Sequence, residues 1–74
     1  MIVADAQVSD ESLLEIAERH VLEGAARVAR QRELIAKLRV DGRSTVAAAE
    51  LLAIFEEVQT VFEQDLARIK NSLK

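Results

Sequence analysis

Metal coordination is the most specific chemistry that the residue types and spacings of this chain could support. His20 and Glu23 are three residues apart, which places them on one face of a helix, and further carboxylates precede them at Glu11, Glu15 and Glu18. Di-iron helical bundles use the related pattern Glu-x-x-His together with carboxylates from the other helices. Here the order is reversed, and Phe62 takes the position on the second predicted helix where an inward-facing ligand would be needed. We therefore expect no metal ion and no other cofactor, and we interpret His20 as a structural residue.

Groups for nucleophilic or acid–base catalysis are missing or dispersed. The chain has no Cys, so it has no thiol nucleophile, and it has neither a Gly-rich phosphate loop nor a Ser beside a plausible base. Acid–base catalysis needs two groups in a shared, partly dry pocket, whereas the carboxylates here are spread over exposed helical faces. A narrow helical bundle also leaves little room for a substrate cavity. The sequence predicts that the protein is not an enzyme.

A basic segment extends from residue 27 to residue 43. Its positive residues outnumber Glu33 and Asp41, so it could contact phosphates, and a nucleic-acid-associated regulator is the alternative function. However, the chain has no Trp or Tyr to stack on bases, and its formal net charge is −3, which does not favour nucleic acid as a partner. We expect the segment to pair instead with acidic residues of the second helix. The basic residues are Arg27, Arg30, Arg32, Lys37, Arg39 and Arg43, and the acidic ones are Glu50, Glu56 and Glu57.

Two regular patterns of apolar and small residues define the elements that carry these groups. Both patterns alternate steps of three and four residues, which is the heptad spacing of a helix that packs along a seam. They predict α-helices over about residues 9–41 and 45–72. The first seam is Leu14, Ala17, Val21, Gly24, Val28, Gln31, Ile35 and Leu38; the second is Ala48, Leu52, Phe55, Gln59, Phe62, Leu66, Ile69 and Leu73.

The helix boundaries follow from capping residues. Ser9 is the predicted N-cap of the first helix, and Ser12 with Glu15 forms a rival capping box three residues later. These signals divide the chain into an N-terminal arm, residues 1–8, and a helical domain, residues 9–74. The first helix should end at Asp41-Gly42, because Gly adopts the left-handed conformation that closes helix C-termini at little steric cost. Either Ser44 or Thr45 can cap the second helix.

The very short connection predicts that the two helices are antiparallel neighbours. With the turn near residue 43, Gly24 should face Phe62, and Val28 should face Gln59. A large ring opposite a small residue is knobs-into-holes packing, and it accounts for a helix-interior Gly, which costs about 1 kcal/mol relative to Ala. Gln31 and Gln59 lie inside the seams, where they need hydrogen-bond partners and can fix register or oligomeric state.

Both helices carry more apolar surface than one partner helix can cover. We therefore predict an all-α, antiparallel two-helix hairpin that dimerises into a four-helix bundle. The alternative is that a different protein supplies the missing helices. The additional apolar residues beside the seams are Leu13, Ile16, Leu22, Leu34, Leu51, Ile54, Val58 and Val61.

The sequence also bears on localisation. The N-terminal residues do not combine a basic region with a long apolar core, as a secretory signal would. No apolar run approaches the ~20 residues of a membrane span. The expected location is the cytoplasm, with no membrane partner.

The run Ala29-Arg30-Gln31-Arg32-Glu33 followed by Asp41-Gly42 is the most specific part of a longer pattern that covers residues 15 to 70. In this pattern the chain resembles a family of short helical proteins of unknown function that are common in rhizobia and related alphaproteobacteria. The family pattern usually has Glu where this chain has Ala25, and often His where it has Phe62. The resemblance implies a bacterial helical protein, supports the fold and adds no activity. From the surplus apolar surface of the hairpin, the expected function is a protein–protein interaction or regulatory module that acts as a homo-oligomer. The other matching residues are His20, Gly24, Ile35, Leu38, Thr45, Ala48, Leu51-Leu52, Phe55-Glu56-Glu57, Gln59, Asp65 and Arg68.

Overall fold

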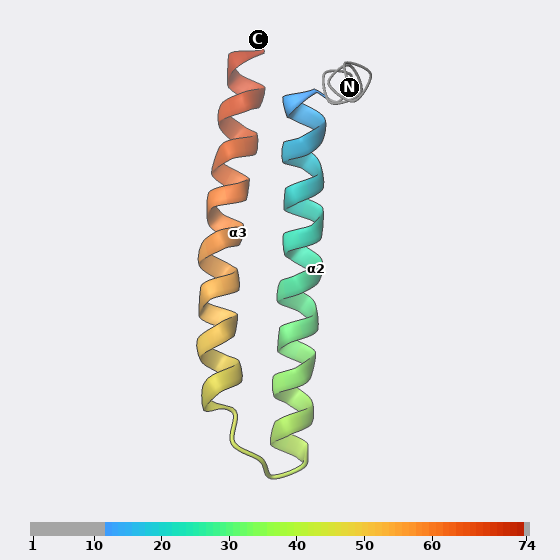
Figure 1. Ribbon diagram of the computed structural model, residues 1–74, viewed down its shortest axis with the longest axis vertical. Coiled ribbons are helices and arrows are strands. Elements are labelled where there is room, and N and C mark those ends of the chain that lie inside the picture. Colours follow the sequence, from blue (N-terminus) through green and yellow to red (C-terminus); the bar gives the residue numbers. More distant parts are fainter. Residues whose placement is uncertain (1–11, 74) are drawn as a thin grey trace, which may run out of the picture.

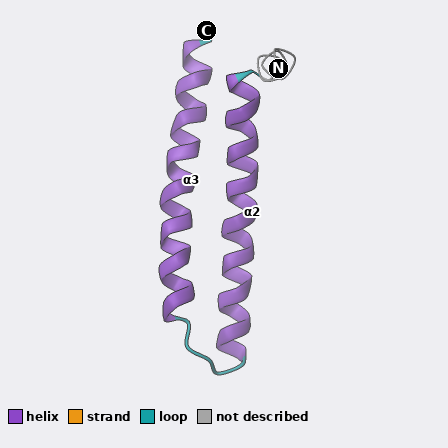
Figure 2. Ribbon diagram, viewed as in Figure 1, coloured by secondary structure: helices purple, strands orange, loops and turns teal. Residues whose placement is uncertain are grey.

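The computed structural model describes residues 12–73, which form two helices packed side by side (Figure 1). Helix α2 spans Leu13–Val40 and helix α3 spans Val46–Ser72. They run antiparallel, so the start of α2 and the end of α3 lie at the same end of the hairpin. No strand occurs in the described part of the chain (Figure 2). The predicted all-α hairpin is confirmed, and the predicted arm, residues 1–8, lies outside the described residues.

Helix α2 begins at the rival capping box. The Ser12 hydroxyl accepts a hydrogen bond from the Glu15 backbone N–H at 3.1 Å, and the Glu15 carboxylate accepts one from the Ser12 backbone N–H at 3.0 Å. This reciprocal pair satisfies two backbone donors that have no partner inside the helix. The predicted start at residue 9 is therefore wrong for this helix, which begins at Leu13. Ser9 itself lies outside the described residues.

Helix α2 ends where the sequence predicted. Gly42 has a φ of +69°, a left-handed conformation that costs Gly little. Its N–H donates to the Arg39 carbonyl at 3.1 Å, and the Arg43 N–H donates to the Leu38 carbonyl at 2.8 Å. These two bonds are those of a Schellman motif, which closes the last turn of a helix by satisfying its free carbonyls.

A short turn then leads into α3. Thr45 is the N-cap by position, but its side chain makes no capping hydrogen bond. The Ser44 hydroxyl instead accepts a bond from the Val46 N–H at 3.3 Å. Of the two predicted caps, Ser44 supplies the hydroxyl contact at this end of the helix.

The hairpin core is thin and lies almost wholly on α2. The buried residues of α2 are Ala17, Gly24, Val28, Gln31 and Ile35, whereas no described residue of α3 is buried. Gly24 of α2 is covered by the larger Gln59 and Phe62 side chains of α3, which remain partly accessible to solvent. A single row of contacts therefore holds the two helices together.

Within the described residues, neither α2 nor α3 combines the length and the hydrophobicity that a membrane-spanning helix needs.

Candidate interaction surface

The predicted seam residues lie along the contact between the two helices. On α2, Gly24, Val28, Gln31 and Ile35 are buried. Ala17 near the start of the first seam is also buried, and Ala48 on α3 is half-buried. Leu73, the last residue of the second seam, is 65% exposed and therefore does not join the contact. The other predicted seam residues are partly buried. These are Leu14, Val21 and Leu38 on α2, and Leu52, Phe55, Gln59, Phe62, Leu66 and Ile69 on α3.

Two glutamines tie the helices together in opposite directions. Gln31 Nε2 on α2 donates a hydrogen bond to the Ala48 carbonyl of α3 at 2.9 Å. Gln59 Nε2 on α3 donates to the Val21 carbonyl of α2, also at 2.9 Å. Each amide thus reaches a backbone acceptor of the facing helix, and a slide of one helix along the other would break both bonds. These contacts fix the register inside the hairpin.

Gly24 provides the space that Gln59 occupies. A Cβ atom at Gly24 would overlap Gln59 Oε1, would lie 2.9 Å from Gln59 Cδ and would be 3.3 Å from Phe62 Cδ2. Phe62 is the neighbour that the seam predicted, but the nearer group is the Gln59 amide, which had been paired with Val28. Gln59 Oε1 is buried without a hydrogen-bond partner. A flexible side chain thus fills the gap that the prediction assigned to the ring.

We predict that Gly24→Ala and Gln59→Ala are strongly coupled in a double-mutant cycle of chemical denaturation. Alone, Gly24→Ala gains about 1 kcal/mol of helix propensity but displaces the Gln59 amide, whose hydrogen bond contributes about 0.5–1.5 kcal/mol. The two terms nearly cancel. In the Gln59→Ala background the new methyl group has space, so the same change should stabilise the hairpin by about 1 kcal/mol. An equal effect of Gly24→Ala in both backgrounds would contradict this packing.

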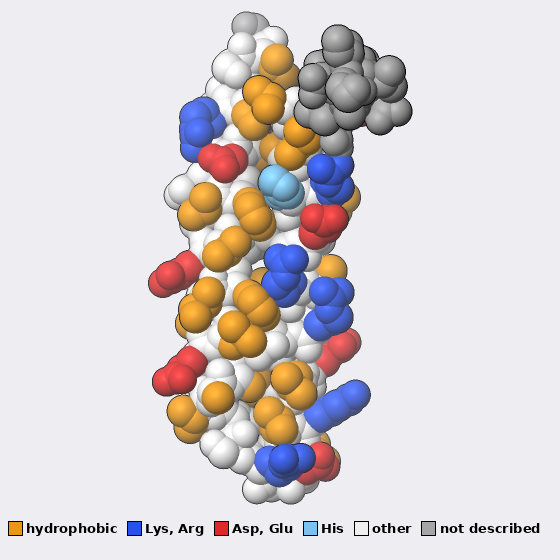
Figure 3. All heavy atoms as spheres, viewed as in Figure 1, with side chains coloured by type: hydrophobic (Ala, Val, Ile, Leu, Met, Phe, Trp, Pro, Cys, Tyr) orange, Lys and Arg blue, Asp and Glu red, His pale blue; other side chains and the backbone are white. Residues whose placement is uncertain are grey.

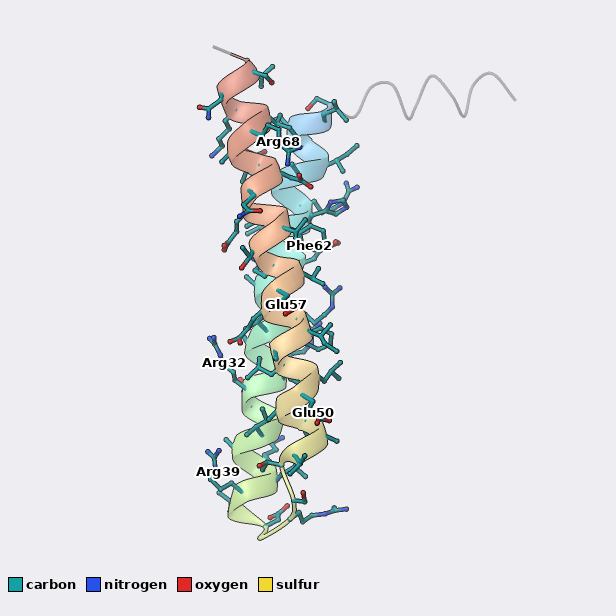
Figure 4. The ribbon with its side chains drawn as sticks, turned by 90° about the vertical axis from the view of Figure 1, so that its left-hand side faces the viewer. Arg32, Arg39, Glu50, Glu57, Phe62 and Arg68 are labelled. Atoms are coloured by element: carbon teal, nitrogen blue, oxygen red, sulfur yellow. The ribbon has the colours of Figure 1, made fainter. Side chains whose placement is uncertain are left out.

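The basic segment pairs with the acidic helix only in part. Arg32 and Glu56 form an ion pair between the helices, with Nη2 and Oε2 separated by 2.8 Å. Both side chains are about half exposed, so the pair contributes little to stability. Glu50 and Glu57 lie on the side of α3 that faces away from α2 (Figure 4). The predicted pairing with these two carboxylates is therefore wrong, because their helical positions point outward.

Arg27 makes a contact that the sequence analysis missed. Its guanidinium carbon lies 5.8 Å from the centroid of the Phe55 ring on α3, within the range of a cation–π interaction. The spacing of the two seams could have indicated this neighbour, since Arg27 precedes the buried Val28. The charge patterning alone assigned Arg27 to a carboxylate.

His20 packs as an aromatic residue. Its ring centroid lies 5.0 Å from that of Phe62, and both rings line a surface groove of about 170 Å³ together with Ile16 and Asp65. Among residues 12–73, no group of three or more His, Cys, Asp or Glu residues is placed to hold a metal ion. By packing against Phe62, His20 extends the contact surface between α2 and α3.

The exposed surface of α3 carries a row of branched aliphatic side chains, the aliphatic stripe, formed by Leu51, Ile54, Val58 and Val61. Their exposed fractions are 42%, 54%, 39% and 53%, respectively. Apolar side chains gather over α3 on this face, beside His20 (Figure 3). Their spacing of three, four and three residues places them on one side of the helix. They form a second heptad seam that α2 does not cover.

The stripe is edged by charge on the side of α2. Arg27 lies over Phe55, next to the stripe, and Glu23 and Arg30 are exposed nearby on the same helix. Glu50 and Glu57 lie on the outer side of α3 (Figure 4), and at 100° per residue the helix places them at the opposite edge of the stripe. An apolar centre with a charged rim is the usual anatomy of a protein–protein contact.

In comparisons with known proteins, no family, no curated protein and no solved structure matches this chain.

Proposed function

We propose that this protein is a protein–protein interaction module that acts as a homodimer, in which two hairpins form a four-helix bundle. The observation that carries the proposal is the aliphatic stripe, a row of four large branched side chains that remain 39–54% exposed on one face. Contiguous exposed apolar surface of this kind marks a contact with another macromolecule more often than a solvated face.

The energetics of the hairpin point in the same direction. No described residue of α3 is buried, and no described side chain in the hairpin falls below 2% exposure. A small chain that buries so little of its apolar surface is marginally stable by itself. Covering the stripe would remove apolar area from water at roughly 25 cal/mol per Å². Association and stability are therefore linked in this proposal.

The arrangement of polar groups supports an interaction role over a catalytic one. The surface groove of about 320 Å³ beside the Arg32–Glu56 ion pair is lined by Gln59, Thr60 and Glu63. The Thr60 hydroxyl in this groove donates its hydrogen bond to the backbone carbonyl of Glu56 at 3.1 Å. It is therefore not held by a side-chain base, as an activated nucleophile would be.

Sedimentation equilibrium over micromolar to millimolar concentration tests the proposal. We expect the mean mass to rise from one chain to two as the concentration increases, with helix content and thermal stability rising together with it. A folded chain that keeps the mass of a single copy throughout this range would overturn the proposed function.

A further inference from the structure

We propose that the partner of the aliphatic stripe is the same stripe of a second copy, with the two α3 helices packed antiparallel about a two-fold axis that crosses α3 at the level of residue 56. This inference rests on the proposed self-association and adds its geometry. It predicts which residues meet across the interface and which ends of the two hairpins lie together.

The stripe is symmetric about that axis. Leu51 and Val61 are equally far from residue 56, and so are Ile54 and Val58. In an antiparallel pair, Leu51 of one copy therefore meets Val61 of the other, and Ile54 meets Val58. Each pair combines a larger with a smaller side chain, and every contact occurs twice, as an isologous interface requires.

The ends of the stripe agree with this centre. Continuing the spacing by four residues in each direction reaches Ala47 and Asp65, which are again equally far from residue 56. Asp65 forms an ion pair with Arg68, in which Asp65 Oδ1 and Arg68 Nη2 are separated by 2.6 Å. The row of large apolar side chains therefore ends at the small Ala47 toward the start of α3 and at the charged Asp65 toward its end. These two residues limit the apolar contact to the four positions of the stripe.

Glu23 and Arg30 of α2 are complementary about the same axis, whereas Arg27, which lies over the Phe55 ring, is at the level of the axis itself. The contacts His20–Phe62 and Gly24–Gln59 place residue 56 of α3 at the level of residues 26 and 27 of α2. The axis then brings Glu23 of one copy to the level of Arg30 of the other, twice. Both residues are exposed, and their separation of seven residues puts them on the same side of α2. Opposite charges thus meet beside the apolar centre.

The other face-to-face arrangement, with the two-fold axis parallel to the helices, is less favourable. It would lay the stripe of one copy on α2 of the other, where Val58 would lie between the levels of Glu23 and Arg27. The apolar row would then cover charged groups instead of a second apolar row. Because burial of apolar area is the dominant favourable term in association, we assign the antiparallel α3 pairing.

Distance measurements between spin labels distinguish the two arrangements. The chain has no Cys, so Ala53→Cys and Ala67→Cys each give one label per copy, at exposed positions outside the stripe. For antiparallel α3 helices centred at residue 56, the two labels at 67 should be separated along the helix axis by roughly 33 Å and those at 53 by roughly 9 Å, from the rise of 1.5 Å per residue.

Each outcome of this experiment decides between the proposals. A much longer distance at 67 than at 53, in labelled chains that sediment as dimers, is the expected result. Equal distances at the two positions in a dimer would overturn the antiparallel pairing while leaving the proposed function intact. Labelled and unlabelled chains that both sediment as single copies, without a measurable coupling, would overturn both.

Discussion

The substitution Val58→Glu is expected to raise the dissociation constant of the dimer at least about 100-fold. Val58 lies at the centre of the aliphatic stripe, where the antiparallel arrangement sets it against Ile54 of the partner. Burying a carboxylate without a counter-charge costs several kcal/mol, and every 1.4 kcal/mol is a factor of ten in affinity. The two-fold axis places two such carboxylates in one interface. Sedimentation equilibrium would measure the change.

The hairpin itself should tolerate this substitution. The Val58 side chain is 39% exposed in the single hairpin, so a Glu there can reach water. Glu also has a higher helix propensity than Val. Circular dichroism at concentrations below the dissociation constant should therefore show the same helix content as in the unaltered chain.

Ala53→Glu is the matched control for Val58→Glu. It adds the same charge to the same helix at an exposed position, and five residues along a helix turn the side chain to another side. We expect its dissociation constant to stay within about threefold of that of the unaltered chain, since rim charges contribute little. An equal loss of association in both variants would point to net charge, and an undiminished Val58→Glu dimer would contradict a contact through the stripe.

The fold was predictable because its determinants are local. The alternation of three and four residues defines both helices, and Gly42 provides the left-handed position that ends α2. The start of α2 was harder to predict, because Ser9 and Ser12 both suit an N-cap. The deciding feature is the reciprocal bond between Ser12 and Glu15, which satisfies two backbone donors where Ser9 alone would satisfy one.

The contacts across the seam were less predictable because they depend on side-chain conformation. Gln59 reaches the Val21 carbonyl and fills the space at Gly24, whereas residue spacing favoured Phe62 for that space. A flexible amide can extend along the helix toward a backbone acceptor, and a pattern of residue types carries no information about that choice. Similarly, charge counting could not show that Arg27 lies over Phe55.

The surface assigned to association was visible in the sequence only as surplus apolar residues beside the seam. The structure separates them by exposure. Ile16 lies with His20 in a groove between the helices, and Leu22, 72% exposed, stands apart from the stripe on the other helix. Only the positions on α3 form a continuous row. Burial in three dimensions was needed to tell this row from isolated exposed side chains, which are common on protein surfaces.

The substitution Ile35→Ala is expected to lower the free energy of unfolding of the hairpin by about 2–4 kcal/mol, because removal of a buried aliphatic side chain costs its transfer free energy and leaves a cavity. Ile35 is 8% exposed, in the row of α2 residues that forms the core. Chemical denaturation followed by circular dichroism would measure the loss. For a small domain this is a large part of the total stability, so a partly unfolded population should appear near room temperature.

Ile54→Ala removes the same atoms from the aliphatic stripe and so separates the two apolar surfaces. Ile54 is 54% exposed in the single hairpin, and its loss should cost less than about 1 kcal/mol at concentrations where the chain is monomeric. At concentrations where the chain is dimeric the cost should grow, because the stripe is then buried, whereas the cost of Ile35→Ala should be similar in both regimes. If Ile54→Ala had the same effect at every concentration, the stripe would not be the surface through which the chain associates. If Ile35→Ala had an effect as small as that of Ile54→Ala in the monomer, the seam between α2 and α3 would not be what holds the hairpin together.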